Sequence, residues 1–354
     1  MNAAINPVAT RANVSAQPFL TADVGGTRAR VALVQASADG DCGLEVLAWR
    51  EYACADFPGV SELLRAFIDS IAGIPVRHCV LACAGQVMGD EVLNDNLAWP
   101  IRVRELRNAL ALDDIAVLND FEALGYALDG MRAEGGRLLC GPDVRGEGPT
   151  LVIGPGTGLG AAVRLPHSAG GHVLTTEAGQ MDFAANTLRE REILAKLAPH
   201  GGYVAYERIV SGPGLLTLYA TLCQLQGVTP QLATPEAITE AAVTSGDAQA
   251  VEAVEIFCAT LGSFVGDLAM VFMAAGGVYL AGGFLYSMFA MLERSAFEER
   301  FLHGRSARAF LSRVPVRVTE HGRRGVLGAA SWYLERKAAD VAVLQQGTPM
   351  EVAS

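Results

Sequence analysis

The sequence predicts an α/β protein with two lobes, and three observations lead to this prediction. The chain has 354 residues with 51% hydrophobic content, more than one core usually supports. Short apolar segments typical of strands alternate with longer segments that have helical spacing. A strand, a glycine turn and a second strand occur over residues 19–35 and again over residues 150–165, which indicates an internal repeat at the scale of a domain.

Composition and charge restrict the classes of partner. The formal net charge is −11 and the basic residues form no cluster, so we expect neither nucleic acid nor a membrane as a partner. Residues 1–18 lack the continuous apolar stretch of a signal peptide and are typical of a polar tail. The seven cysteines, an odd number, suit a reducing compartment in which cysteine packs as a small hydrophobe. We therefore expect a cytoplasmic protein.

The first repeated segment, FLTADVGGTRARVALVQ (residues 19–35), predicts a strand hairpin, because its second apolar run follows the glycines with no intervening helix. Paired glycines are common in ordinary tight turns. Two features also suit a phosphate. Asp23 ends the first strand, where its carboxylate could hold a hydrated Mg²⁺, and residues 25–27 leave N–H groups available to surround a phosphate.

Two strands are expected between the hairpins, in VRHCVLACAG (residues 76–85) and DDIAVLNDFEALGYAL (residues 113–128). The second strand ends at Asn119 and Asp120, where open α/β sheets place ligand-binding groups, although an ordinary helix cap explains an aspartate there equally well. In the first strand, Cys79 and Cys83 share one face of an apolar run. That position favours core packing over a metal site.

The second repeated segment, TLVIGPGTGLGAAVRL (residues 150–165), matches the dinucleotide-binding pattern at Gly156, Gly158 and Ala161. That pattern must open a helix, whereas here only the strand-like residues 161–165 precede a proline. We therefore predict a second hairpin that faces phosphate across a cleft from the first.

The C-terminal half is the more helical, with helices expected over residues 187–198, 211–227 and 253–275. Residues 268–292 carry no charge and are long enough to cross a bilayer. However, two Gly-Gly pairs bracket VYLA within this segment. They predict a helix end, a short buried strand and the start of another helix rather than a membrane span.

Taken in order, these segments resemble the bacterial glucokinases, ATP-dependent hexose kinases with the two-lobed, actin-like, ribonuclease-H-like fold. The resemblance covers about residues 19–335 and rests on ADVGGTRAR, NLAW, LNDFEA, GPGTGLG, EAGQMDFA, YERIVSGPG and YLAGG. It implies a homodimer with an active site in the cleft between the lobes of each chain. The implied organisation is a flexible tail (residues 1–18), a small α/β lobe (19–128 plus about 325–354) and a larger, more helical lobe (129–324).

The resemblance also implies roles for single residues in a reaction that transfers the γ-phosphate of ATP, with Mg²⁺, to the 6-hydroxyl of glucose. Asp120 would be the general base for that hydroxyl. The residues implied to hold the sugar are Asn96, Asn119, Glu177, Gln180 and Glu207. The residues implied to bind nucleotide are Ala22, Asp23, Val24, Gly25, Gly26, Thr27, Gly156, Thr157 and Gly158, with Gly282 and Gly283 near the adenosine; Asp23 would hold Mg²⁺ through water.

Two departures from the family pattern bear on sugar binding. The family usually has Glu-Gly-Gly-His where this chain has Glu177, Ala178, Gly179 and Gln180, and it usually has Asn in place of Arg28. Ala178 is strained only if that backbone needs a positive φ, whereas Gln180 replaces an imidazole ligand of the sugar. Two hypotheses follow: a working glucokinase, or a kinase-derived sugar-binding or regulatory protein. The retained carboxylates and phosphate loops favour the first.

Overall fold

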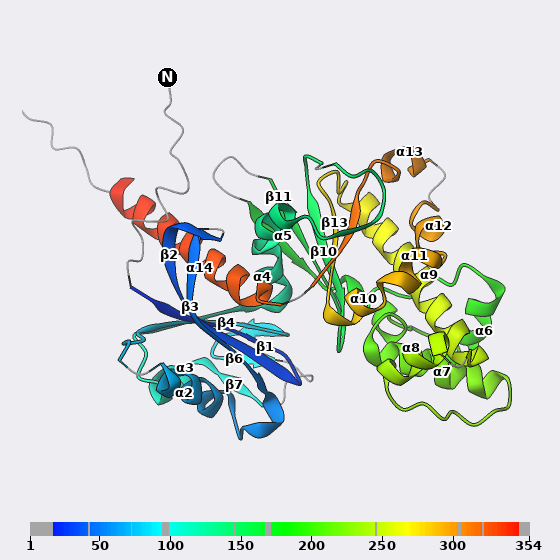
Figure 1. Ribbon diagram of the computed structural model, residues 1–354, viewed down its shortest axis with the longest axis horizontal. Coiled ribbons are helices and arrows are strands. Elements are labelled where there is room, and N and C mark those ends of the chain that lie inside the picture. Colours follow the sequence, from blue (N-terminus) through cyan, green and yellow to red (C-terminus); the bar gives the residue numbers. More distant parts are fainter. Residues whose placement is uncertain are drawn as a thin grey trace, which may run out of the picture. The chain divides into compact units, whose positions relative to one another are not determined.

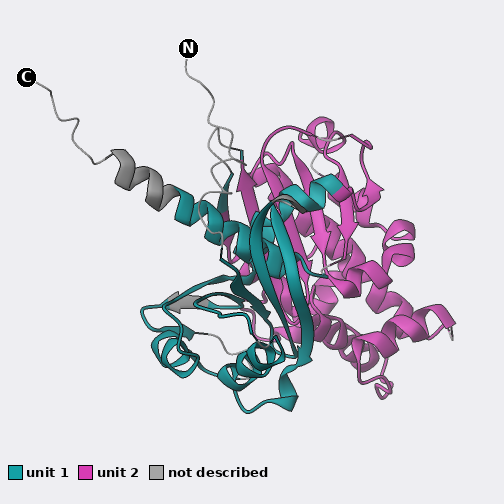
Figure 2. Ribbon diagram, turned by 60° about the vertical axis from the view of Figure 1, so that its left-hand side comes forward, with its two compact units in different colours: residues 1–133, 166–173, 322–354 teal, residues 134–165, 174–321 magenta. Residues whose placement is uncertain are grey.

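The computed structural model describes residues 17–346, except Cys42, Ala72, 94–98, Arg145, 167–170, Ser245, 304–305 and His321. The chain forms two compact units, shown in Figure 2. Unit 1 comprises Met1–Ala133, Pro166–Val173 and Gly322–Ser354, and unit 2 comprises Glu134–Leu165 and Leu174–His321.

Unit 1 is built on a five-stranded sheet with the order β3-β2-β1-β4-β8. Its strands are β1 (Phe19–Val24), β2 (Arg28–Asp41), β3 (Leu44–Ala53), β4 (His78–Cys83) and β8 (Asp114–Asn119). β1 and β2 form the antiparallel hairpin that the sequence predicts, whereas β1, β4 and β8 run parallel. The register pairs Val24 with Cys83 and Cys83 with Asn119, so the carboxyl ends of these three strands meet at one edge.

Helices cover both faces of this sheet. Successive side chains of its strands point to opposite faces, and each face packs against helices in its own hydrophobic core. Leu20, Ala22 and Val24 pack with residues of α2 (Val60–Ser70) and α3 (Val103–Ala109). Phe19 and Ala82 pack with residues of α4 (Asp120–Tyr126) and α14 (Arg324–Gln346). The unit also contains η1 (Cys54–Asp56), α5 (Leu128–Glu134) and a small sheet of β5 (Gln86–Met88), β6 (Glu91–Leu93) and β7 (Ile101–Arg102).

Helix α14, near the C-terminal end of the chain, belongs to unit 1 and packs against its N-terminal sheet (Figure 1). A Cβ atom at Gly328 would lie 1.8 Å from the carbonyl oxygen of Ala123, so only glycine lets α14 approach α4 this closely. The hydroxyl of Thr21, which is fully buried in β1, donates to the carbonyl oxygen of Val326 at 2.9 Å. These contacts fix the helix against the strand that leads to Asp23.

Unit 2 repeats the same strand arrangement, as the repeated sequence pattern predicts. Its six-stranded sheet has the order β12-β11-β10-β13-β14-β9. The hairpin of β10 and β11 is antiparallel, and β10, β13 and β14 run parallel. The strands are β9 (Arg137–Cys140), β10 (Thr150–Pro155), β11 (Leu159–Leu165), β12 (His172–Thr176), β13 (Gly277–Ala281) and β14 (Val316–Thr319).

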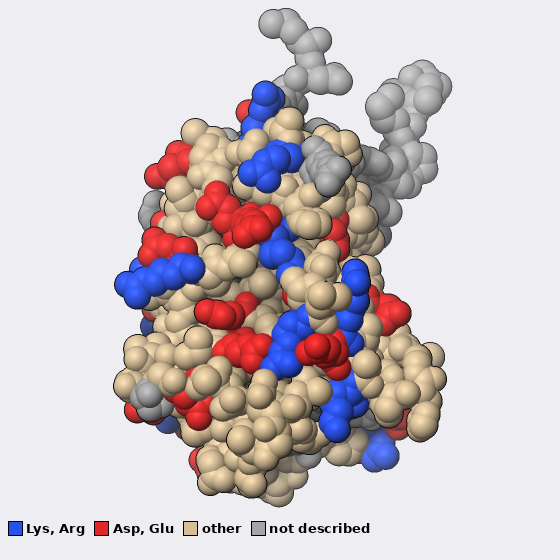
Figure 3. Space-filling view, turned by 90° about the vertical axis from the view of Figure 1, so that its right-hand side faces the viewer, with Lys and Arg blue, Asp and Glu red and all other residues tan. Residues whose placement is uncertain are grey.

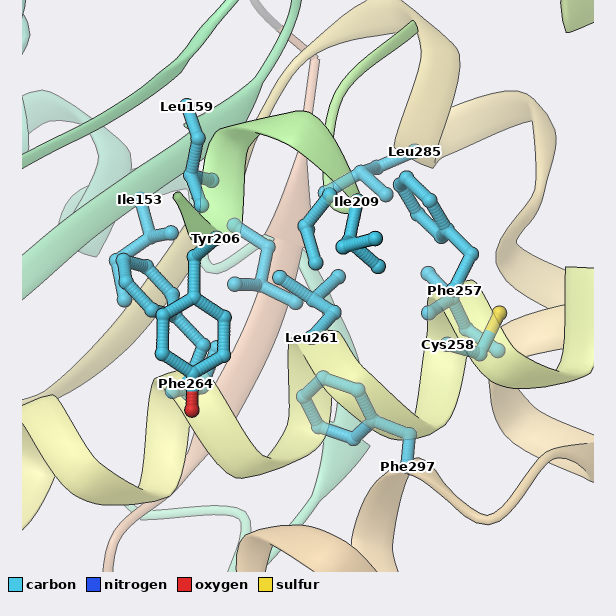
Figure 4. Close-up of a cluster of buried hydrophobic side chains, with 14 of the residues drawn as sticks. Ile153, Leu159, Tyr206, Ile209, Phe257, Cys258, Leu261, Phe264, Leu285 and Phe297 are labelled. Carbon is cyan, nitrogen blue, oxygen red and sulfur yellow. The ribbon is translucent and has the colours of Figure 1, made fainter. Parts of the chain in front are cut away.

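The rest of unit 2 is helical. Its elements are η2 (Ala178–Gln180), α6 (Leu188–Leu197), η3 (Tyr206–Arg208), α7 (Gly212–Leu225), α8 (Pro235–Thr244), α9 (Ala248–Val271), α10 (Gly283–Ser287), α11 (Phe289–Arg294), α12 (Phe297–Phe301) and α13 (Arg308–Leu311). In the core drawn in Figure 4, the rings of Tyr206 and Phe264 lie side by side, with centroids 5.1 Å apart. Tyr206 and Ile209 thus anchor the segment that carries Glu207 onto α9.

Helix α9 is long and apolar enough to cross a membrane by length and composition, and 72% of its apolar window is buried inside the protein. The helix ends at Val271, and β13 and α10 follow, as the paired glycines predict. The apolar segment over residues 268–292 is therefore not one continuous helix.

On the face of the molecule shown in Figure 3, acidic and basic side chains lie interspersed.

A buried ion pair joins α6 to α12 in unit 2. The Arg300 guanidinium donates to both carboxylate oxygens of Glu190, at 2.7 and 3.3 Å, and to the hydroxyl of Ser263 at 2.9 Å. The Glu190 side chain is only 2% exposed, and it also accepts hydrogen bonds from the backbone N–H groups of Asn186 and Thr187 as part of the capping box of α6. The pair is therefore satisfied on both sides.

Candidate active site

The first glycine loop, residues 25–27, is a closed turn that is hydrogen-bonded to a buried cysteine. The Gly25 N–H donates to the carbonyl oxygen of Arg28 at 3.0 Å. The Cys54 N–H donates to the carbonyl oxygen of Thr27 at 2.9 Å, and the Cys54 thiol lies 3.4 Å from the carbonyl oxygen of Gly25. These hydrogen bonds to the carbonyl oxygens of the loop hold its backbone in one conformation. Thr27 itself is exposed.

The residues that flank this loop divide into core and surface. Ala22 and Val24 are fully buried in β1, so they can reach a nucleotide only through their backbone groups. Arg28, which replaces the usual Asn, has a side chain that is 68% exposed and forms an ion pair with Glu51 on β3. Hydrogen bonding from Arg28 lowers the pKa of Glu51, since it favours the ionised carboxylate.

Asp23 lies at the carboxyl end of β1, only 5% exposed, with the guanidinium of Arg30 at 3.5 Å. A Cβ atom at Gly325 would lie 2.4 Å from its Oδ2, so the start of α14 packs directly on this carboxylate. Mg²⁺ keeps most of its waters and takes few protein ligands, so the single carboxylate of Asp23 would be enough to hold the ion through water. Among the described residues, no group of three or more His, Cys, Asp or Glu side chains forms a metal site.

Asn119 and Asp120 lie where β8 passes into α4, and the structure assigns the helix cap to Asn119. Its Oδ1 accepts from the N–H groups of Phe121, at 2.9 Å, and Glu122, at 3.2 Å, while its amide donates to the carbonyl oxygen of Gly85 at 3.3 Å. Asp120 is the first residue of the helix, and its carboxylate accepts from the Phe121 N–H at 3.0 Å. The sequence offered a helix cap as the alternative role of the aspartate, and that alternative is wrong, because Asn119 is the cap.

The carboxylates of Asp23 and Asp120 lie near the same buried thiol. Burial, together with the charges of Asp120 and Asp23, raises the pKa of Cys83 to about 12. Burial likewise raises the pKa of Cys79 to about 12. Both cysteines lie in the core of unit 1, as predicted. Asp23 and Asp120 therefore lie at the same edge of the sheet, at the ends of β1 and β8.

The second glycine loop, residues 156–158, is held by a carboxylate from a distant segment. The Gly156 N–H donates to the carbonyl oxygen of Gly158 at 2.7 Å, which closes the turn. At the loop's end, the Leu159 N–H donates to Oε2 of Glu207 at 2.8 Å. A Cβ atom at Gly158 would lie 2.5 Å from the same oxygen, so a larger residue there would displace the Glu207 carboxylate. Gly156 and Thr157 are exposed.

The two segments implied to hold the sugar are paired with each other by backbone hydrogen bonds. The Phe183 N–H donates to the carbonyl oxygen of Val204 at 2.7 Å, and the Tyr206 N–H donates to that of Met181 at 2.9 Å. Gly179 lies against the second loop, since a Cβ atom there would be 2.0 Å from the carbonyl oxygen of Leu159. This packing keeps residues 177–180 beside Glu207.

Gln180 and Glu207 contact each other directly. The Gln180 amide donates to Oε1 of Glu207 at 3.3 Å, so both oxygens of this carboxylate accept hydrogen bonds. Glu177 is exposed, and its carbonyl oxygen accepts from the Gln180 N–H at 2.9 Å. Ala178 is not among the described non-glycine residues with positive φ, which are Ala111 and Met273, so its backbone is unstrained. Gln180 and Glu207 are therefore in contact, and Glu207 also supports the second loop.

Gly282 and Gly283 begin α10 at the carboxyl end of β13. Gly282 has φ +147°, a conformation that strongly favours glycine, and Gly283 faces open space. Asn96 lies outside the described residues. Sequence reasoning missed Tyr203, whose hydroxyl donates to the carbonyl oxygen of Gln180. No motif marks this tyrosine, because its partner is 23 residues away in the chain.

Comparisons with known proteins show the family of this chain. The family model described as Glucokinase matches residues 20–336. The chain is 43% identical to a glucokinase-like protein of Xylella fastidiosa (strain 9a5c), covering 94% of this chain and 99% of that protein. It is 35% identical to a glucokinase of Stenotrophomonas maltophilia (strain R551-3), covering 93% and 99%. It is also similar to the crystal structure of a glucokinase from an Antarctic psychrotroph, with 30% identity, a TM-score of 0.77, and coverage of 90% and 99%.

The fold and the retained loops define a sugar kinase of the actin-like ATPase fold. The family match over most of the chain makes the assignment more specific. The chain belongs to the glucokinase family.

Proposed function

We propose that the protein is an ATP-dependent glucokinase that transfers the γ-phosphate of ATP to the 6-hydroxyl of glucose. The observation that carries this proposal is the arrangement at the end of β8, where Asn119 caps the helix and Asp120 lies at the same edge of the sheet as Asp23. A binding protein has no use for a base there. The names of the glucokinases to which the chain is similar support the same activity.

The chemistry needs an aligned hydroxyl, a nearby carboxylate and N–H groups around the transferred charge. In our proposal, Asp120 takes the proton of the 6-hydroxyl as that oxygen attacks the phosphoryl group. The backbones of residues 25–27 and 156–158 hold phosphates through N–H groups other than those of Gly25 and Gly156, which close the two turns. Asp23 holds Mg²⁺ through water, and the cation neutralises charge on the phosphates when bound.

Glu177, Gln180 and Glu207 are proposed to hold the other sugar hydroxyls. An amide nitrogen has two hydrogens, so Gln180 can donate one to Glu207 and the other to a hydroxyl. Asn119 likewise donates only one of its two amide hydrogens to Gly85, which leaves its proposed contact with sugar chemically possible. A homodimer and a cytoplasmic location stay predictions.

The activity is tested by measuring ADP release from ATP and Mg²⁺ in the presence of glucose and of a panel of other hexoses. Release that depends on glucose supports a working glucokinase. Turnover that prefers another hexose would keep the kinase and replace the substrate. Glucose binding without any hexose-dependent ADP release would favour the alternative, a sugar-binding or regulatory protein derived from a kinase.

We expect Gln180→His to lower the KM for glucose several-fold, with kcat changed less than twofold. An imidazolium can offer a charge-assisted hydrogen bond, and it has one rotatable bond fewer to fix than glutamine, together worth about 1 kcal/mol. If the lost binding free energy for the sugar is the same in the ground state and in the transition state, KM changes and kcat does not. Steady-state kinetics of the two proteins measures this, with Gln180→Asn as a control that keeps an amide but shortens its reach. An equal or higher KM in Gln180→His would mean that the pocket is built around glutamine.

A further inference from the structure

The second glycine loop meets the carboxylate of Glu207 at two neighbouring positions. The Leu159 N–H donates to Oε2 of Glu207 at 2.8 Å. Gly158, the residue before it, lies so close that a Cβ atom there would be 2.5 Å from the same oxygen and 3.2 Å from the Cδ atom of Glu207. The loop therefore supplies a hydrogen-bond donor for this carboxylate and also leaves open the space that the carboxylate fills.

The loop backbone decides where this carboxylate lies. Tyr206 and Ile209 anchor the backbone of η3 in the core of unit 2, but the Glu207 side chain is only half-buried and has several torsions to fix. Its other donor is the side-chain amide of Gln180, at 3.3 Å. The Leu159 N–H is the closer donor, and it belongs to strand β11, whose backbone cannot rotate away as a side chain can. The loop therefore fixes the carboxylate more firmly than Gln180 does.

Glu207 keeps the capacity to bind a sugar while it accepts these two hydrogen bonds. A carboxylate offers about four lone-pair sites on its two oxygens. Leu159 uses one site on Oε2 and Gln180 uses one on Oε1, so each oxygen can also accept from a hydroxyl. Hydrogen bonds weaken steeply when their distance or angle changes. A sugar hydroxyl therefore binds well only if the carboxylate stays where the loop holds it.

We propose that Gly158 and Leu159 are positioning residues for hexose recognition, because they set the place of the Glu207 carboxylate that accepts from a sugar hydroxyl. The inference rests on the proposed function and deepens it. It gives the second glycine loop, which is proposed to hold phosphate, a part in hexose affinity even when no nucleotide is bound.

Gly158→Ala is the first test. Gly158 is not among the glycines with positive φ, so its backbone suits alanine. The added methyl group meets the end of a flexible side chain, and the fold can accept it by displacing the Glu207 carboxylate. We expect the Kd for glucose, measured by calorimetry without nucleotide, to rise about tenfold or more, the usual worth of hydrogen bonds to a charged group. The urea midpoint of unfolding should stay close to that of wild type.

Gly156→Ala is the matched control, because it makes the same change in the same loop. A Cβ atom at Gly156 would meet nothing within 4 Å, and this glycine also lacks a positive φ. The Kd for glucose without nucleotide should stay within about twofold of wild type, since no hydrogen bond to the sugar is lost. Equal weakening of glucose binding in Gly156→Ala and Gly158→Ala would overturn the proposal, because the effect would then come from the loop in general.

A double-mutant cycle separates positioning of the carboxylate from a structural role of the glycine. In a Glu207→Ala background no carboxylate remains to be displaced. Gly158→Ala should then change the Kd for glucose by less than about twofold, because the two residues act through one contact. A tenfold effect that persists in this background would mean that Gly158 acts through the fold, and the proposal would be wrong.

The third measurement uses the wild-type protein and needs no turnover. Glucose without nucleotide should shift the backbone amide resonance of Leu159 in protein labelled with ¹⁵N-leucine, because the carboxylate that accepts from this N–H gains a sugar hydroxyl as a further donor. Leu159→Ile assigns the resonance by its loss. Leu151, at the other end of the same hairpin, provides the control resonance, which should not move. An unchanged Leu159 resonance in protein saturated with glucose would overturn the proposal.

These binding measurements are independent of the test of the proposed function, which is ADP release. A protein that binds glucose without phosphorylating any hexose would lose the proposed function, while the Kd values and the Leu159 resonance would still decide the inference. Conversely, a working glucokinase whose glucose affinity is the same in Gly158→Ala as in wild type would keep the proposed function and lose the inference.

Discussion

Asp120→Asn should lower kcat by about 100-fold or more, the usual worth of a positioned general base. The asparagine has nearly the same size and can still accept the hydrogen bond from the Phe121 N–H, but it cannot take a proton. Since Asn119 caps α4, the helix keeps its cap in the variant. We therefore expect an unchanged fold and unchanged glucose binding, with the loss confined to the chemical step.

The measurements are steady-state ADP release and glucose binding by calorimetry. Asp113→Asn is the matched control, because it makes the same change just before β8, where the aspartate forms an exposed ion pair with Arg77 at 3.6 Å. Such a pair contributes little, so kcat should stay within twofold. If Asp120→Asn kept a kcat within threefold of wild type, Asp120 would not be the base.

Arg300→Met should lower the free energy of unfolding of unit 2 by about 3–5 kcal/mol, the usual cost of leaving one partner of a buried ion pair alone. Glu190 is 2% exposed and would keep a charge with neither the guanidinium nor water to compensate it. Unfolding in urea measures the change. The double variant Glu190→Gln with Arg300→Met should recover part of the loss, since no buried charge then remains.

Arg189→Met provides the control for this prediction. Arg189 forms ion pairs with Glu192 and Glu252, and all three side chains are more than a quarter exposed. Exposed pairs contribute about 0–1 kcal/mol, so this variant should be nearly as stable as wild type. Equal losses of unfolding free energy in Arg189→Met and Arg300→Met would mean that burial does not determine what the ion pair contributes.

The cost of Arg300→Met should also shrink as the pH falls. Burial by itself raises the pKa of Glu190, but the hydrogen bonds and charge of Arg300 and the backbone N–H groups hold it below its ordinary value of 4.5. The pair's contribution is therefore present above about pH 4.5 and is lost as the pH falls through the lowered pKa. In the variant, only the backbone N–H groups of Asn186 and Thr187 still oppose the effect of burial, so Glu190 takes up a proton more readily than in the wild type. Urea unfolding at pH 7 and pH 4 should show the smaller difference at pH 4.

Local sequence patterns were sufficient for the elements that carry the site. Apolar runs on both sides of residues 25–27 and 156–158 predict the two hairpins, because a tight turn forces adjacent strands to pair. The glycine pairs around VYLA predict β13 for a similar reason, since glycine interrupts helices. The sequence was not sufficient at Asn119 and Asp120, because both residue types cap helices. Only the backbone geometry shows that Asn119 is the cap.

The sequence by itself determined the family, the order of the main elements and the candidate site residues, because these depend on motifs of a few neighbouring residues. Only the tertiary structure decided what those residues touch. Glu207 supports a loop 48 residues earlier in the chain and contacts Gln180, 27 residues away. Tyr203 completes that set through the pairing of two separate segments. Contacts of this kind depend on how loops pack onto a shared core, and local patterns carry no information about that packing.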